Sequence, residues 1–350
     1  MVIGAHINGD NAEESLLLFA LKKVAVLQPQ LKFILFTNAT LKDLPQCFVQ
    51  INVSPKPKNK LLLLYWYKYK LPKLLSKYSI TSFISNAGML ATDLPLNQYI
   101  FIENRNLFLQ QKGFLKNNFA DAIATAKTVF VTDSLLGNEF KKMFAANKLK
   151  QICFNRNELN LSFTFKETEA IKEKYTSGFD YYLFPVNATL KPNIVSVLKA
   201  FSQLKKWQKT SLKLMLLFEN EIDEKLLPDF KNYKYKNDVV SVKETVQNSL
   251  SLTAASFAFI FLGDYSYKQN VYDALQYNIP VIAADTNDNR ILFNQAVAYA
   301  SLTTEGLAQQ LQIMYKDEIY KKLQIQHANQ FLTDFDNQKN AQMFLEIISN

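Results

Sequence analysis

Residues Phe257–Asp285, FAFIFLGDYSYKQNVYDALQYNIPVIAAD, contain two short apolar runs separated by a more polar stretch. The runs Ser256–Gly263 and Pro280–Asp285 have the length and composition of buried strands, and the stretch between them is long enough for one helix. Strands that alternate with helices form parallel sheets with crossover helices. This part of the chain therefore predicts a doubly wound α/β domain.

The same alternation continues towards the N-terminus of this domain, with Asp180–Pro185 and Leu212–Glu219 as further strand candidates. One amphipathic helix is predicted between these two strands, because apolar residues recur there at helical spacing. These residues are Ile194, Val197, Leu198, Phe201 and Leu204. Three lysines fall largely on the other positions of this helix: Lys199, Lys205 and Lys206.

The first half of the chain repeats the pattern, which predicts a second α/β domain before the polar segment Leu161–Ser177. Its strand candidates are Val2–Ala5, Lys32–Thr37, Ser82–Asn86, Gln98–Glu103 and Lys127–Thr132. A chain of 350 residues with 48% hydrophobic residues can bury two cores of ordinary size. We expect domains at residues 1–165 and 166–350, and the last helix can cross back to the first domain.

Composition argues against several classes of protein. Apolar runs are far shorter than the ~20 residues of a membrane-spanning helix, and the N-terminus has no secretory-signal pattern, so we expect a cytoplasmic protein. Cys47 and Cys153 have no metal-ligand spacing with His6 or His327, and no dinucleotide or phosphate-loop motif is present. The formal charge of +9 favours anions in general, but no nucleic-acid-binding motif accompanies it, so no nucleic acid is expected.

Residues Phe257–Asp285 resemble the donor-binding stretch of the large retaining group of GT-B glycosyltransferases, which reads roughly F-x-x-P-S-x-x-E-G-F-G-x-x-x-x-E-A-M-A-x-G-x-P-V-I-A. Without gaps, Asp273 falls on the second glutamate, and Pro280–Ala283 match outright. Lys191–Ile194 resemble the R-K-N segment of the same group, and Trp66, Leu71-Pro72 and Pro95 resemble a pattern of its mannosyltransferase-like members. The resemblance implies a GT-B fold, that is, two Rossmann-like doubly wound domains that face a central cleft.

Departures from the motif lie in the donor site that the resemblance implies. The first motif glutamate is Tyr265 here, and two motif glycines are Ser266 and Lys268, so the backbone cannot approach a diphosphate as closely. The Arg-Lys pair of the family becomes Lys191-Pro192, and Lys268 can replace part of the lost charge.

Four residues would bind the nucleotide-sugar donor: Lys191, Asn193, Lys268 and Asp273. The alternative interpretation is that the lysines are solvated and that Asp273 pairs locally within a helix.

On the acceptor side, the catalytic-loop histidine of the family falls on Glu103, and its first-strand loop corresponds to His6–Asp10. The resemblance therefore implies Glu103 and His6 as catalytic residues and Gly9 and Asp10 as residues that face the acceptor. Alternatively, Glu103 forms a surface ion pair with Arg105 and His6 is hydrogen-bonded near the core.

Asp334-Phe335-Asp336 has the form of a metal-binding D-x-D motif, but we interpret it as a surface loop. No cofactor and no metal are expected, since this fold class generally needs none.

The run Lys56–Lys77 mixes lysines with aromatic residues and contains no acid. That composition suits peripheral contact with anionic lipid at the inner face of the membrane. A core-packed helix with a solvated basic face is the alternative.

The resemblance implies a retaining, hexosyltransferase-type glycosyltransferase. It would transfer a sugar from a nucleoside-diphosphate-sugar to a glycan or lipid-linked acceptor in cell-surface polysaccharide synthesis. The alternative is a catalytically inactive GT-B module that binds a glycan or a partner glycosyltransferase, because the glycines, the arginine and the glutamate of the donor site are replaced together.

Overall fold

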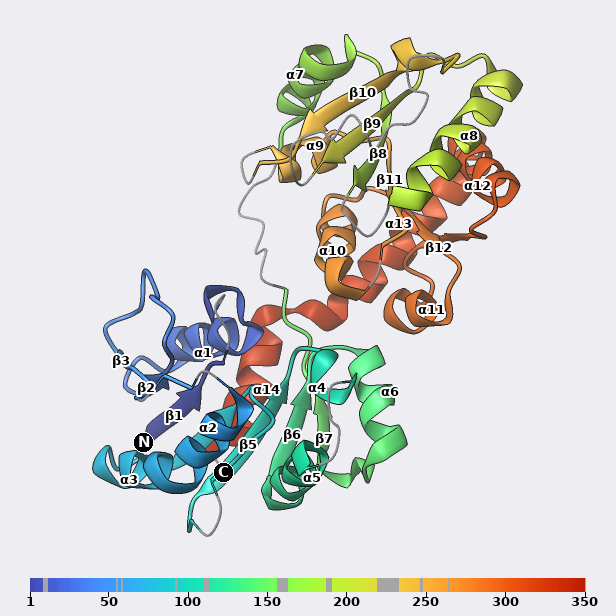
Figure 1. Ribbon diagram of the computed structural model, residues 1–350. Coiled ribbons are helices and arrows are strands. Elements are labelled where there is room, and N and C mark those ends of the chain that lie inside the picture. Colours follow the sequence, from blue (N-terminus) through green and yellow to red (C-terminus); the bar gives the residue numbers. More distant parts are fainter. Residues whose placement is uncertain are drawn as a thin grey trace. The chain divides into compact units, whose positions relative to one another are not determined.

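The chain forms two compact units, each with its own parallel sheet (Figure 1). The computed structural model describes residues 1–8, 12–54, 56–57, 59–91, 94–109, 114–155, 163–186, 191–218, 233–245, 248–263 and 265–349. The first unit comprises Met1–Arg156 and Phe335–Asn350, and the second comprises Asn157–Asp334. The chain is thus divided at Asn157 and returns to the first unit at Phe335, whereas the sequence analysis placed one boundary after residue 165.

The sheet of the first unit has seven parallel strands in the order β3-β2-β1-β4-β5-β6-β7. In that order they are β3 (Phe48–Ile51), β2 (Lys32–Phe36), β1 (Val2–His6), β4 (Ser82–Ser85), β5 (Asn97–Ile102), β6 (Thr128–Val131) and β7 (Leu149–Gln151). The inner strands are almost entirely buried, because helices cover both faces of such a sheet.

The helices of the first unit include one from the far end of the sequence. They are α1 (Leu16–Leu27), α2 (Lys60–Tyr65), the π-helical segment η2 (Trp66–Lys70), α3 (Leu71–Lys77), α4 (Asn106–Leu109), α5 (Phe114–Thr125), α6 (Ser134–Met143) and α14 (Asn337–Ser349). Helix α14 contacts α1, and its Phe344 ring lies 4.9 Å from that of Phe130 and 5.8 Å from that of Phe101. The last helix is therefore part of the hydrophobic core of the first unit.

The second unit has six parallel strands in the order β10-β9-β8-β11-β12-β13. In that order they are β10 (Val239–Lys243), β9 (Lys213–Phe218), β8 (Tyr181–Val186), β11 (Ala258–Phe261), β12 (Val281–Ala284) and β13 (Ala298–Ala300). Its helices are α7 (Phe165–Thr176), α8 (Lys191–Gln208), α9 (Ser249–Ala254), α10 (Lys268–Gln276), α11 (Asn287–Phe293), α12 (Thr304–Lys316) and α13 (Glu318–Leu332).

Helix α8 confirms the predicted amphipathic helix, since all five of its predicted apolar residues are buried in the core of the second unit. The three lysines of this helix differ in exposure. Lys199 and Lys206 are exposed, but Lys205 is 6% exposed because it forms an ion pair with Asp238.

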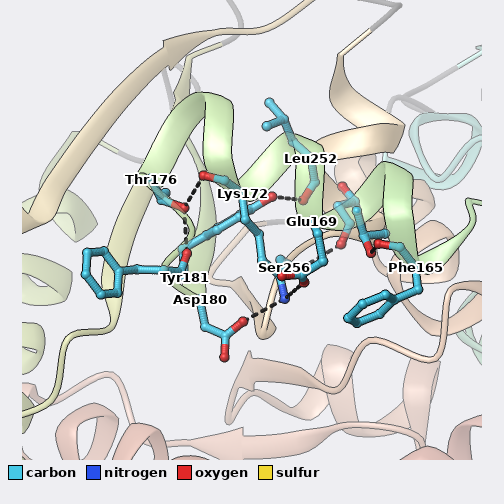
Figure 2. A network of polar contacts seen from close by, with 11 residues as sticks. Phe165, Glu169, Lys172, Thr176, Asp180, Tyr181, Leu252 and Ser256 are labelled. Carbon is cyan, nitrogen blue, oxygen red and sulfur yellow. Dashed lines mark hydrogen bonds and ion pairs between the residues drawn. The ribbon is translucent and has the colours of Figure 1, made fainter.

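The polar segment Leu161–Ser177 contains helix α7, which forms polar contacts with other residues of the second unit (Figure 2). Lys172 forms ion pairs of 2.8 Å with both Glu169 and Asp180, and the hydroxyl of Thr176 donates to the carbonyl of Lys172. The buried hydroxyl of Tyr181 donates to the carbonyl of Leu252 at 2.6 Å. The segment therefore belongs to the folded second unit.

Asp334 and Asp336 are exposed, as the surface-loop interpretation expected, although the first of them lies in a short helix rather than in a loop. Asp334 lies in a 3-10 helix (Thr333–Phe335), and the exposed carboxylate of Asp336 accepts hydrogen bonds from the amides of Gln338 and Lys339 at the start of α14. In the described part of the chain, no helix combines the length and the apolarity needed to cross a membrane.

Candidate functional site

Glu103, the residue after β5, caps helix α1. Its Oε2 atom accepts hydrogen bonds from the amides of Leu16 at 2.5 Å and Leu17 at 3.3 Å, and its Oε1 accepts one from the hydroxyl of Ser15 at 2.8 Å. A carboxylate at this position satisfies amides that have no partner inside the helix and complements the positive end of the helix dipole. The alternative interpretation expected an ion pair between Glu103 and Arg105. That expectation was wrong, because the Nη2 atom of Arg105 pairs with Glu139 at 2.6 Å instead.

Asn86 joins this carboxylate to the first strand. Its side-chain amide donates to Oε1 of Glu103 at 2.6 Å, and its side-chain oxygen accepts from the amide of Asn8 at 2.7 Å. Because β1, β4 and β5 are neighbours in the parallel sheet, their carboxyl ends lie at one edge. The residues that follow these three strands are therefore connected by hydrogen bonds.

His6, the last residue of β1, belongs to a second buried cluster at this edge. Its Nδ1 atom lies 2.6 Å from the hydroxyl of Tyr67, which in turn lies 2.6 Å from the hydroxyl of Ser85 at the end of β4. The π-helical segment η2 supplies Tyr67, and its neighbour Trp66 has its ring centroid 5.1 Å from that of His6. These contacts agree with the alternative interpretation of His6 as a hydrogen-bonded residue near the core.

Burial determines the ionisation of this cluster. It lowers the pKa of His6 to about 3, so the imidazole is neutral near pH 7. Burial also raises the pKa of Tyr67 well above its ordinary value, against the smaller effect of its hydrogen bond with Ser85. Both groups can therefore donate or accept a hydrogen bond without carrying charge.

Helices α8 and α10 are among the helices of the second unit that begin at the carboxyl edge of its sheet. Helix α8 begins at Lys191 after β8, and α10 begins at Lys268 after the neighbouring strand β11. The side chain of Asn193 donates to the carbonyl of Leu262 at 3.4 Å, which ties the start of α8 to the segment after β11. Helix N-termini present unpaired amides and partial positive charge, so this edge has the character of an anion site.

Lys268 is half-buried at the start of α10. Its ammonium group donates to the hydroxyl of Tyr265 at 2.5 Å and lies 3.9 Å from the centroid of the same ring. Tyr265 occupies the position of the first motif glutamate, so the contact holds the ammonium group at the turn where the family motif has its glycines. Lys268 is therefore positioned by a neighbour from the same turn.

Asp273 lies inside α10 and is 7% exposed. Its carboxylate accepts a hydrogen bond from the side chain of Gln269, one turn earlier, at 3.0 Å. Burial, with a smaller contribution from the charge of Asp273, raises the pKa of Tyr277 to about 12. The local pairing that the alternative expected is present, and the role of Asp273 in donor binding stays a prediction.

Asn278 supports the alignment with the family motif, because it falls on a motif glycine after α10 and has a φ of 58°. Asparagine tolerates this left-handed conformation better than most residues other than glycine.

Some of the predicted site residues cannot be placed. Gly9 and Asp10 lie outside the described residues, and for Lys191 the backbone position alone is described. In the first unit Glu103 and His6 lie at one sheet edge, and in the second Asn193 and Lys268 do so.

The sequence analysis missed Tyr67, Ser85 and Asn86 as members of the first-unit clusters. Ser85 and Asn86 were detectable, because two polar residues follow the apolar pair Phe83-Ile84 at the end of the strand candidate Ser82–Asn86. Tyr67 had no such signal, since it reaches the strand ends from a helix far away in the sequence.

Comparison with solved structures supports the GT-B architecture. WaaG, a glycosyltransferase involved in lipopolysaccharide biosynthesis, superposes with a TM-score of 0.66 at 12% identity over 100% of both chains. Anabaena Alr3699/HepE in complex with UDP gives a TM-score of 0.72 at 13% identity over 99% of each chain. A glycosyltransferase from Rickettsia africae gives 0.71 at 15% identity over 100% of this chain and 99% of the other.

No protein-family model and no curated protein matches the sequence. The two doubly wound sheets and these full-length likenesses define the fold as GT-B, with two Rossmann-like domains. The doubly wound α/β class predicted from the strand and helix pattern is confirmed, and so is the GT-B fold that the motif resemblance implied.

Proposed function

We propose that the protein is a glycosyltransferase that uses a nucleoside-diphosphate-sugar as its donor. The observation that carries the proposal is the pair of helix N-termini at the ends of β8 and β11, each of which begins with a lysine. A diphosphate carries the charge that such an arrangement attracts. The solved structure of HepE with UDP, whose fold covers the whole of this chain, supports the same class of ligand.

In the proposed reaction, the amides of the two helix N-termini and Lys268 stabilise the departing diphosphate. Preorganised charges of this kind account for much of the rate in many enzymes. Asp273 orients the donor, with Lys191 and Asn193 at the start of α8. The family resemblance favours a hexosyl donor, retention of the anomeric configuration and no requirement for a metal ion.

The proposed acceptor is a glycan or a lipid-linked saccharide of cell-surface polysaccharide synthesis. WaaG acts in lipopolysaccharide biosynthesis, which supports this class of acceptor. Within the first unit, the neutral imidazole of His6 and the carboxylate of Glu103 lie at the strand ends where ligands of such folds bind. We propose that they face the acceptor, together with Gly9 and Asp10.

Contact with an anionic membrane is proposed for the helix formed by α2, η2 and α3. One face of this helix is core, since Trp66 and Leu71 are fully buried. The other face exposes the lysines Lys68, Lys70, Lys73 and Lys77 next to Leu61, which is 66% exposed, and Tyr69, which is 50% exposed. Exposed apolar side chains among lysines fit the interface of an anionic bilayer, and the protein would act at the inner face of the membrane.

Vesicle sedimentation tests the membrane contact. Wild-type protein should bind phosphatidylglycerol vesicles better than phosphatidylcholine vesicles, and Lys68→Glu/Lys70→Glu should remove most of that difference. Equal binding to both vesicle types would eliminate this part of the proposal.

The second candidate is a non-catalytic GT-B module that binds a glycan or a partner glycosyltransferase. The contacts of Glu103 favour it, because a carboxylate that caps a helix has a structural reason to be present. The replacement of the motif glycines by Ser266 and Lys268 favours it as well.

A panel of nucleoside diphosphates and nucleotide-sugars, screened by thermal shift and then by calorimetry, separates the two candidates. A ligand at 100 times its dissociation constant should raise the free energy of unfolding by ~2.7 kcal/mol. Binding of one nucleotide in preference to the others, followed by sugar transfer to acceptor extracts, is expected. If no nucleotide binds, the enzyme proposal fails and the binding module becomes the better account.

A further inference from the structure

A cavity of about 410 Å³ opens at the end of α8, at the amino edge of the second sheet. Its walls come from the end of α8 with the two residues that follow it, and from the segment before β10; the lining residues are Lys205, Lys206, Lys209, Thr210, Lys234, Tyr235 and Asp238. Because β9 begins at Lys213 and β10 at Val239, these residues lie at the sheet edge opposite to the starts of α8 and α10. Figure 1 shows α8, β9 and β10, whose ends form this region. The cavity is therefore separate from the proposed donor site.

Four lysines and one aspartate line the cavity, which gives its lining a net charge of +3. The lysines are Lys205, Lys206, Lys209 and Lys234, and the aspartate is Asp238. Lysines near a helix C-terminus complement the helix dipole, which explains Lys205 and Lys206. It does not explain Lys234, which a separate segment brings to the same cavity.

The aspartate is already paired with two ammonium groups. Its Oδ2 atom lies 2.9 Å from Lys205 Nζ, and its Oδ1 atom lies 2.7 Å from Lys213 Nζ. Partial burial opposes ionisation of Asp238, but the hydrogen bonds and charges of Lys213 and Lys205 outweigh it and hold its pKa below the ordinary value. The single negative charge of Asp238 therefore neutralises one of these two ammonium groups and does not neutralise the other lysines of the lining.

Lys205 is the buried lysine of the cavity lining, and we call it the floor of the cavity. Its side chain is 5% exposed, and its ammonium group contacts Asp238 and donates to the carbonyl of Thr210 at 2.6 Å. An ammonium group has three donors, so one N–H remains beyond these two contacts.

The other lysines lie at the rim of the cavity. Lys206, Lys209 and Lys234 are exposed, and no carboxylate in the described part of the chain forms an ion pair with any of them. Lys209 has a φ of 47°, which turns the backbone at the end of α8. Three lysines around one cavity, with no carboxylate partner among the described residues, repel one another, and a bound anion would relieve that repulsion.

We propose that this cavity is a second anion site that binds a ligand carrying two or more phosphate charges. Lys205 contacts the anion from the floor, Lys206, Lys209 and Lys234 contact it from the rim, and the hydroxyls of Thr210 and Tyr235 can donate further hydrogen bonds. A diphosphate or a multiply phosphorylated headgroup has this chemistry, and a cavity of this size falls in the range of small-molecule sites.

Calorimetric titration with inorganic pyrophosphate tests the site. Lys206→Glu/Lys209→Glu should weaken binding at least tenfold, and raising the salt concentration should weaken binding to the wild type. The matched control is Lys316→Glu/Lys322→Glu, which makes the same change in net charge at two exposed lysines of α12 and α13. The control should bind within twofold of the wild type, and unchanged melting temperatures verify that both variants fold.

Pyrophosphate also resembles the diphosphate of a nucleotide-sugar, so the titration is repeated with Lys268→Ala. The affinity that depends on Lys206 and Lys209 should persist in that variant, whether or not the donor proposal is correct. If pyrophosphate does not bind, or if the two double variants lose affinity equally, the second anion site does not exist.

Vesicles distinguish the two sources of phosphate. Weaker binding of Lys206→Glu/Lys209→Glu to cardiolipin vesicles, whose headgroup carries two phosphates, with normal binding of the control, would identify a lipid headgroup as the ligand. Unchanged vesicle binding together with weaker pyrophosphate binding would identify a soluble phosphate compound.

Discussion

The carboxyl edges of the two sheets hold polar side chains in different ways. In the first unit, Asn86 donates to Glu103, Glu103 accepts from the amides at the start of α1, and His6 bonds to Tyr67. In the second unit, α8 and α10 begin with lysines, and Lys268 contacts Tyr265 from its own turn. The comparison indicates that substitutions in the first cluster change mainly stability, whereas substitutions at the second edge change mainly ligand affinity.

The largest effect is expected for Glu103→Ala. The change leaves the amide of Leu16 and the side chain of Asn86 without their acceptor, while the amide of Leu17 keeps the hydroxyl of Ser15, so the free energy of unfolding should fall by about 3 kcal/mol. Urea unfolding measures the loss, with Glu346→Ala, at an exposed position of α14, as the control. Glu103→Gln keeps an acceptor oxygen and should lose less. An unchanged urea midpoint for Glu103→Ala would show that the contrast between the two edges is wrong.

The next effect concerns pH and His6. Between the ordinary pKa of 6.5 and the folded value of about 3, the unfolded state binds a proton that the folded state does not. The free energy of unfolding should therefore fall as pH decreases through this window, by up to ~1.4 kcal/mol per pH unit, or about 2 kcal/mol at pH 5. His6→Gln should remove this part of the pH dependence in urea titrations at pH 7, 6 and 5. The same slope in wild type and variant would mean that His6 is not the group responsible.

A smaller effect, on binding, is expected for Lys268→Ala. Loss of one charge-assisted contact should weaken nucleotide binding by about 20-fold, or ~1.8 kcal/mol. Calorimetry measures the affinity, and Lys316→Ala is the control because it removes an exposed lysine of the same unit. The melting temperature should change little, in contrast with Glu103→Ala. Equal affinities for wild type and Lys268→Ala would show that Lys268 does not bind the nucleotide.

The smallest effect is expected for Asp273→Asn. The substitution keeps the size of the side chain and removes the ionised acceptor, so nucleotide affinity should fall about tenfold, or ~1.4 kcal/mol. Glu318→Gln, at an exposed position of α13, is the control for the change in charge. A variant with normal affinity and lower stability would assign Asp273 to local pairing with Gln269 alone.

The strand predictions show which strands can be recognised from local sequence pattern. All nine predicted strands are present, and the four that were missed are the edge strands β3, β7, β10 and β13. Inner strands are buried on both faces and so have continuous apolar sequences, such as β11. Edge strands are only partly buried; β7 (LKQ) has no buried residue, so its sequence carries little apolar signal.

The candidate site was predictable to a smaller extent. The motif resemblance selected Asn193 and Lys268 as donor-binding residues; the structure places them at the starts of α8 and α10, and their role stays a prediction. It could not indicate that Glu103 caps α1, because the two are separated by more than 80 residues and their contact depends on the order of the strands. It also could not indicate the pairing of Lys205 with Asp238.

The sequence by itself determined the inner strands, the helix α8 and the existence of two α/β domains, because hydrophobic periodicity is a property of neighbouring residues. Only the tertiary structure decided that α14 joins the core of the first unit, that Tyr67 meets His6, and that lysines from two segments surround one cavity. These contacts join residues far apart in the sequence. They form because burial of apolar surface packs whole helices and strands together. The polar side chains at the ends of these elements then form hydrogen bonds with the residues that the packing places next to them.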